Sequence, residues 1–117
     1  MVKVLVVEDS VPVQEKFAKA LSDKVELLQA HTLWQGQMLF NEHKDDLAVI
    51  VMDACVPGDR PNSIGLIRLI RAEGFKGPMI AISSLYEYRM RLIEAGCSHE
   101  CPKDSLPALL EGMLERQ

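Results

Sequence analysis

Short apolar runs alternate with amphipathic stretches along the whole chain. Four runs have the length of strands, residues 3–7, 47–52, 79–82 and 98–102, and residues 25–30 form a plausible fifth. Between them, apolar residues recur at the spacing of one helix face. Strands that alternate with helices are typical of a parallel sheet covered by helices on both faces. We therefore expect an α/β fold of five strands and five helices.

Capping and turn residues mark the ends of the predicted helices. Ser10 reads as the N-cap of the first helix, with Pro12 in its first turn. Gly96 reads as the stop of the fourth helix. We expect Ser84 to cap the fourth helix, which leaves Ser83 free, and Ser105 to cap the fifth. The first helix is expected to end near residue 21, and the others cover residues 32–44, 64–72, 85–95 and 106–114.

Polar residues stand where four of the predicted strands stop. Glu8 and Asp9 follow the first strand, Asp53 the third, Ser83 the fourth and Lys103 the fifth. In open parallel sheets the ligand crevice lies at the carboxyl ends of the strands. The sequence therefore gathers three carboxylates, a hydroxyl and an ammonium at one edge. Such a set suits a divalent cation and a phosphoryl group.

The chemistry of this set favours phosphoryl transfer. Crowded carboxylates repel one another, and a hard divalent cation such as Mg²⁺ relieves the repulsion while leaving positions for phosphate oxygens. One carboxylate, Asp53, can then act as a nucleophile on phosphorus. Lys103, the Ser83 hydroxyl and the metal would each take one oxygen of the transferred group. Taken singly, each residue could equally be a solvated charge, a turn residue or a cap; together they form a specific pattern.

Composition removes several other classes of protein. The chain has 117 residues, which we read as one domain over residues 1–117, and a net charge of -4, which disfavours direct nucleic-acid binding. No apolar run approaches the roughly 20 residues of a membrane span. Glu8 and Asp9 interrupt the first apolar run too early for a signal peptide. Three sparse cysteines are typical of a reducing compartment, so we expect a cytoplasmic protein.

The spacing of Cys97, His99 and Cys101 invites a zinc site. A structural zinc ion needs four ligands, and alternation along a strand would separate these three side chains from any clear fourth ligand. We therefore favour buried thiols.

Over its full length the chain resembles a two-component response-regulator receiver domain. The resemblance rests on residues 6–10, 52–53, 57, 65–66, 78–84, 95–98 and 103. It implies a doubly wound, flavodoxin-like (βα)5 fold whose five-stranded parallel sheet has the order 2-1-3-4-5. It also implies that the protein is not an enzyme in the ordinary sense, because it catalyses only its own phosphorylation and dephosphorylation.

The same resemblance assigns roles to the site residues. Asp53 would accept a phosphoryl group from a histidine kinase or a phosphotransfer protein. Asp9 would bind Mg²⁺ directly and Glu8 mainly through water, and Asp53 together with the backbone carbonyl of Cys55 would complete the ligand set. Ser83 and Lys103 would contact the phosphate. An output domain or output partner is implied but not identified, and a homodimer through the fourth and fifth helices is possible.

Three features depart from the family pattern. An aromatic residue usually stands on strand five where this chain has Glu100, so we expect negative charge on that surface. Asp104 follows Lys103 in place of the usual proline, and we expect a trans peptide bond between them. The loop over residues 57–65 is also a few residues longer than usual, and it borders the predicted site.

These departures keep other functions open. A phosphorylation-independent interaction module would use one fixed surface, and Glu100 with the altered Lys103-Asp104 junction motivates it. A magnesium-dependent phosphatase would share the Asp53 nucleophile, but Cys55 stands where its general acid would be. Tyr86 and Tyr88 could be partner contacts or half-buried packing residues.

Overall fold

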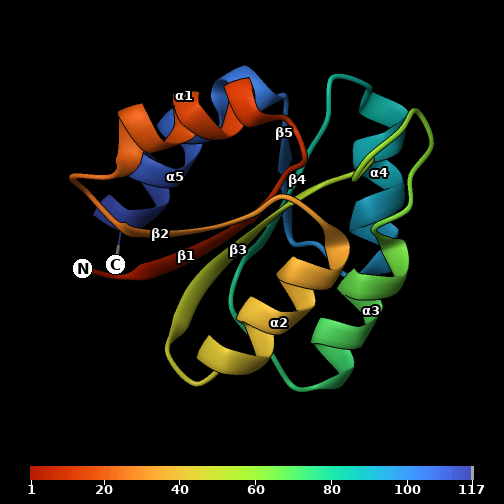
Figure 1. Cartoon of the computed structure of the whole chain (residues 1–117), viewed down its shortest axis with the longest axis horizontal. Coiled ribbons are helices and arrows are strands. Elements are labelled where there is room, and N and C mark those ends of the chain that lie inside the picture. Colours follow the sequence, from red (N-terminus) through yellow and green to blue (C-terminus); the bar gives the residue numbers. More distant parts are fainter. Residues whose placement is uncertain (117) are drawn as a thin grey trace.

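Five parallel strands alternate with five α-helices in the computed structural model, which describes residues 1–116 (Figure 1). The strand order is β2-β1-β3-β4-β5, so the predicted doubly wound topology is confirmed. The strands are β1 (Lys3–Val7), β2 (Glu26–Ala30), β3 (Leu47–Asp53), β4 (Met79–Ile82) and β5 (His99–Cys101). The helices are α1 (Val11–Leu21), α2 (Leu33–His43), α3 (Ile64–Ala72), α4 (Tyr86–Ala95) and α5 (Leu106–Glu115), and a 3-10 turn, η1 (Lys103–Ser105), precedes α5.

The sheet divides the apolar core into two layers because successive side chains of a strand point to opposite faces. Helices α2, α3 and α4 cover one face, where Leu5, Ile50 and Met52 are fully buried (Figure 1). Helices α1 and α5 cover the other, where Val4 and Val6 are fully buried. Both layers continue to the carboxyl ends of the strands, so the residues that follow these ends start from a rigid base. Within residues 1–116, no helix is both long and apolar enough to span a membrane.

The helix caps agree with the sequence only in part. Ser10 caps α1, and its Oγ accepts a hydrogen bond from the backbone N–H of Val13 at 3.4 Å. The prediction that Ser84 caps α4 is wrong: the N-cap is Leu85, and its N–H donates to Oγ of Ser83 at 3.2 Å. The Ser83 hydroxyl accepts this hydrogen bond because a serine side chain readily bonds the backbone N–H two residues ahead.

The predicted side-chain cap of α5 is also absent. Ser105 precedes the helix, but its φ of -91° and ψ of -6° are helical, and its side chain makes no cap hydrogen bond. The chain enters α5 through η1, so Ser105 lacks the extended backbone that a capping side chain needs. Strand β5 is shorter than predicted, since residues 98 and 102 fall outside it.

Cys97 and Cys101 lie in different layers of the core. Cys97 packs in the layer beneath α2–α4, whereas Cys101 packs in the layer beneath α1 and α5. Both thiols are free and buried, and burial raises their pKa values to about 12 and about 11. The thiols are buried, as expected, and burial keeps both neutral near pH 7. Cys97 lies before β5 begins, so strand alternation does not fix its side, and it packs on the opposite side of the sheet from Cys101.

Gly36 marks the closest approach of α2 to the sheet. A Cβ at this position would lie 2.8 Å from Cγ2 of Val7, a fully buried side chain of β1. Glycine at this point therefore lets α2 pack directly against the strand that leads into the site.

We predict that Gly36→Ala destabilises the fold by about 1–3 kcal/mol, because the added methyl group overpacks a β-branched core residue. Urea unfolding measures the change. Gly112→Ala in α5 is the matched control, since its Cβ would meet only the Arg116 side chain at 3.9 Å. Helix propensity should make that variant more stable by about 0.5–1 kcal/mol. Equal stability of Gly36→Ala and wild type would contradict the close packing.

Candidate functional site

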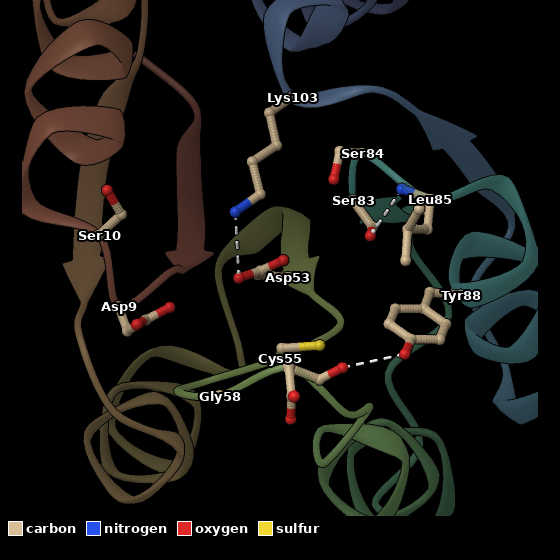
Figure 2. A pocket seen from close by; sticks show the side chains of 11 residues that line it. Asp9, Ser10, Asp53, Cys55, Gly58, Ser83, Ser84, Leu85, Tyr88 and Lys103 are labelled. Carbon is tan, nitrogen blue, oxygen red and sulfur yellow. Dashed lines mark hydrogen bonds and ion pairs between the residues drawn. The ribbon is translucent and has the colours of Figure 1, made fainter.

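The predicted site residues converge at the carboxyl edge of the sheet. Register brings the strand ends level, with Val7 beside Met52 and Asp53 beside Ile82. The cleft above this edge has a volume of about 350 Å³. Its lining comes from the segments that follow β1, β3 and β4, from α4 and from η1, and comprises Asp9, Ser10, Asp53, Cys55, Gly58, Asp59, Ser83, Ser84, Leu85, Tyr88 and Lys103 (Figure 2).

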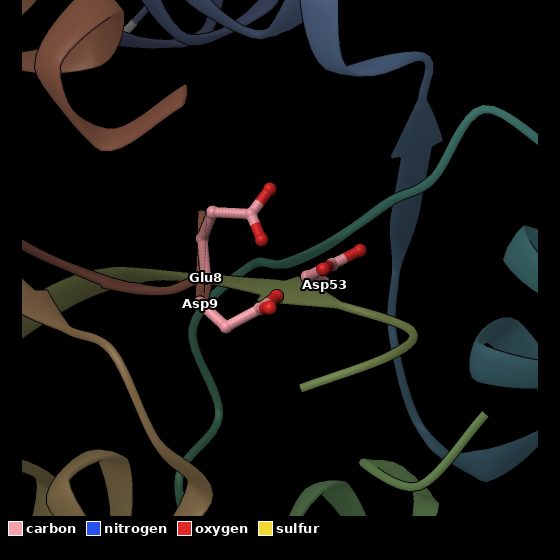
Figure 3. Close-up of side chains that lie close together, drawn as sticks. All are labelled: Glu8, Asp9 and Asp53. Carbon is pink, nitrogen blue, oxygen red and sulfur yellow. The ribbon is translucent and has the colours of Figure 1, made fainter. Parts of the chain in front are cut away.

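Three carboxylates form the floor of the site. One oxygen from each of Glu8, Asp9 and Asp53 lies within 4.8 Å of the others (Figure 3). The side chains differ in burial: Glu8 is 0% exposed and Asp53 3% exposed, whereas Asp9 is half-buried. The sequence therefore places its acidic cluster where water can reach Asp9 but hardly reaches the other two.

Lys103 supplies positive charge between the two buried carboxylates. Its Nζ lies 2.6 Å from Oε1 of Glu8 and 3.3 Å from Oδ2 of Asp53 (Figure 2 draws the second contact). The contact with Glu8 is an ion pair without hydrogen-bond alignment, so the buried Oε1 atom has no hydrogen-bond donor. The single peptide bond in the cis form within residues 1–116 is Val56–Pro57, so the Lys103–Asp104 bond is trans, as predicted.

The crowding shifts the protonation of the carboxyl groups. Burial, followed by the hydrogen bond and charge of Glu8, raises the pKa of Asp53 to about 8. Burial and the same Glu8 charge also raise the pKa of Asp9. Burial opposes ionisation of Glu8 as well, but the Asp53 proton and the Lys103 ammonium outweigh it and lower the Glu8 pKa. Lys103 carries too little charge to compensate all three acids.

This donor set fits a hard divalent cation. Mg²⁺ prefers a few carboxylate oxygens together with water, and the half-buried Asp9 borders an open cleft where waters and phosphate oxygens can complete the coordination. The raised pKa of Asp53 indicates that negative charge exceeds positive charge, since the Lys103 ammonium is shared between Glu8 and Asp53. Cys55 borders the same cleft, so its backbone lies near the proposed ligands.

Two side chains that the sequence analysis missed hold the backbone around these acids. Nε2 of the buried Gln14 lies within 3.2 Å of the carbonyl oxygens of Val6, Glu8 and Ala30 and donates to them. A polar residue on the buried face of α1 was the available signal. In the loop after β3, Asn62 accepts from the Val56 N–H at 2.7 Å and donates to the Val56 carbonyl at 3.0 Å.

The α4 side of the cleft includes Tyr88 from the helix and Ser83 from the loop before it. Ser83 is 6% exposed and its Oγ borders the cleft, while its carbonyl accepts a 2.7 Å bond from Arg89. Tyr88 reaches over the cleft, where its hydroxyl donates to the Asp59 carbonyl at 2.9 Å (Figure 2). Tyr88 is therefore a half-buried cleft residue, whereas Tyr86 is 63% exposed.

Solved structures with the same architecture cover nearly the whole chain. A response regulator receiver domain protein from Clostridium thermocellum is 17% identical, with a TM-score of 0.81 and coverage of 99% of this chain and 96% of that one. The chemotaxis protein CheY4 of Vibrio cholerae is 20% identical, with a TM-score of 0.80 and coverage of 99% and 98%. The chain has the fold of a response-regulator receiver domain.

A third similar structure has higher identity. The N-terminal domain of an uncharacterized protein from Wolinella succinogenes is 29% identical in sequence to this chain, with a TM-score of 0.79 and coverage of 98% of this chain and 91% of that one. No family model and no curated protein matches the sequence.

We predict that Asp53→Asn stabilises the fold, and more so at high pH. A folded pKa of about 8 lies above the unfolded value, so the unfolded chain binds fewer protons and wild-type stability falls as pH rises from about 4 to 8. The variant should gain about 1–2 kcal/mol near pH 8 and less near pH 5. Urea unfolding at both pH values tests this, with the exposed Asp104→Asn as control. A loss of stability in Asp53→Asn would refute the excess of negative charge.

We also predict that Mg²⁺ binding releases a proton near pH 7. The Asp53 carboxyl is largely protonated there and must ionise to take a cation, so affinity should rise by up to roughly tenfold per pH unit below its pKa. Isothermal titration calorimetry in buffers of different ionisation enthalpy measures the proton. Asp9→Asn should weaken binding, whereas Asp104→Asn should leave it unchanged. Affinity independent of pH would contradict the assignment.

Proposed function

We propose that the protein is a phosphorylation-dependent signalling switch of a two-component system and that Asp53 is its phosphoacceptor. The observation that carries the proposal is the environment of the Asp53 carboxyl. It lies at the floor of an open cleft, with Lys103 at 3.3 Å and two further carboxylates within 4.8 Å. A surface carboxylate without a chemical role has no need of such surroundings.

In the proposed reaction, an Asp53 oxygen forms a bond to the phosphorus of a phosphohistidine. The bond between phosphorus and the histidine nitrogen breaks at the same time, and the nitrogen keeps the electron pair. The Lys103 ammonium offsets the charge on one phosphoryl oxygen, and the Ser83 hydroxyl donates to another. Bound Mg²⁺, held by Asp9, Asp53 and the Cys55 carbonyl with Glu8 acting through water, would supply further charge stabilisation.

The expected phosphodonor is a histidine kinase or a phosphotransfer protein. Similar solved structures include a two-component response regulator of the LuxR family and the receiver domain of NtrX, each 23% identical to this chain. The likeness to these regulators supports this class of phosphodonor, but it identifies neither the cognate kinase nor the output. A homodimer, an output partner and a cytoplasmic location belong to the same proposal.

A phosphorylation-independent interaction module is the second candidate. Glu100, in place of the usual aromatic residue, still favours it. The Lys103-Asp104 junction no longer favours it, because the Lys103 ammonium lies near Asp53 even though the Lys103–Asp104 peptide bond is trans. Equal affinity of a partner for the phosphorylated and unphosphorylated chain would support the module. We expect no turnover of phosphomonoesters.

We predict that acetyl phosphate adds one phosphoryl group to the wild-type chain in the presence of Mg²⁺. Intact-mass spectrometry measures the gain. Asp53→Asn should abolish it, because the variant has no nucleophilic carboxylate, and chelation of the metal should slow it. Asp104→Asn removes an exposed carboxylate beside Lys103 and should leave it unchanged. Phosphorylation of Asp53→Asn at the wild-type rate would exclude Asp53 as the acceptor.

A further inference from the structure

Arg89 connects the wall of the cleft to the edge of the sheet. This residue of α4 is 9% exposed, and its guanidinium makes two charge-assisted hydrogen bonds in different directions. Nη1 donates to the Ser83 carbonyl at 2.7 Å, and Nε donates to Oε1 of Glu100 at 2.7 Å. The guanidinium also lies over the Tyr86 ring, 5.6 Å from its centroid. A single buried cation therefore joins the β4–α4 loop to β5.

Glu100 reaches Arg89 because of its register on the edge strand. It pairs with Ala81 of β4, two residues before Ser83. Its neighbour Cys101 packs beneath α1 and α5, so alternation turns Glu100 toward α4. The Glu100 side chain is 34% exposed and does not line the cleft. The predicted negative surface charge is thus largely paired with Arg89.

The bond to the Ser83 carbonyl holds the backbone that carries the Ser83 hydroxyl. Ser83 belongs to a short segment that leaves β4 and enters α4 three residues later, and its Oγ accepts from the Leu85 N–H. If the guanidinium moved, this segment would lose the charged donor that holds its carbonyl. The planar guanidinium can serve both acceptors at once, whereas a lysine ammonium cannot match that geometry.

Glu100 in turn holds Arg89 in place. Within residues 1–116, Glu100 is the acidic partner of the Arg89 guanidinium. A buried cation that loses its carboxylate pays a large desolvation penalty and turns toward water. Removing Glu100 should therefore release the Ser83 carbonyl, although Glu100 touches no reacting atom.

From this chain of contacts we infer that Arg89 and Glu100 are positioning residues for Ser83 in phosphoryl transfer to Asp53. The inference rests on the proposed function.

The test is a double-mutant cycle between Glu100 and Ser83, with acetyl phosphate as the phosphodonor, Mg²⁺ present and intact mass followed over time. Glu100→Ala should slow phosphoryl gain by roughly threefold to tenfold, the scale of a misplaced contact group. In a Ser83→Ala background the same change should have an effect below about 1.5-fold, since coupled residues are not additive.

Conservative and distant variants separate positioning from general damage. Glu100→Gln keeps an oxygen that accepts the Arg89 Nε–H but loses the charge, so its rate should lie between those of Glu100→Ala and wild type. Glu94→Ala removes an exposed carboxylate from α4 and should have no effect. If Glu100→Ala is unfolded at the assay temperature, Arg89→Lys replaces it, and its effect must likewise vanish in the Ser83→Ala background.

The outcomes distinguish the two proposals. A wild-type chain that gains no phosphoryl group overturns the proposed function and, with it, this inference. A wild-type chain that is phosphorylated, but in which Glu100→Ala has no effect or an equal effect with and without Ser83, overturns this inference alone. An effect confined to chains that retain Ser83 supports it.

Discussion

The position of one ammonium group among three carboxylates is the constraint on which the site depends. Lys103 pairs with Glu8 and lies near Asp53, while Asp9 completes an acidic set that carries more negative charge than a single lysine offsets. Burial makes this imbalance costly, because water cannot solvate the excess charge. The imbalance explains why Asp53 holds a proton near neutral pH and why a divalent cation suits the cleft. It also means that a change at any member alters the protonation of the others.

The sequence predicted the parts of the fold that depend on local patterns. The strand runs and the convergence of Glu8, Asp53 and Lys103 followed from apolar runs that stop at polar residues and from the rule for parallel sheets, whereas the strand order came from the resemblance to receiver domains. The errors came where three-dimensional contacts decide. Ser83 rather than Ser84 accepts the Leu85 N–H, because backbone direction after β4 selects the acceptor.

Side chains that join distant segments were beyond sequence reasoning. Gln14 binds carbonyls of β1 and β2, and nothing local announces such partners. Arg89 resembles an ordinary helix residue until β5 brings Glu100 beside it. Sequence analysis could name the candidate site residues, since their chemistry depends on residue type. It could not name the side chains that hold the surrounding backbone, because those contacts exist only in the folded chain.

The loop after β3 is anchored at its base, and at its tip the contact with Tyr88 is made by the backbone carbonyl of Asp59 and not by a side chain. Asn62 and Ser63 tie its two ends to the backbone of residues 54 and 56, whereas Asp59 and Arg60 at the tip are exposed. Side chains at the tip can be substituted without disturbing the carboxylates beneath, because the hydrogen bonds of Asn62 and Ser63 hold the ends of the loop in place. In evolutionary terms, the side chains at the tip can diversify while the carboxylate cluster beneath them is kept. Descendants of such a chain could differ in this exposed surface and retain the same cleft.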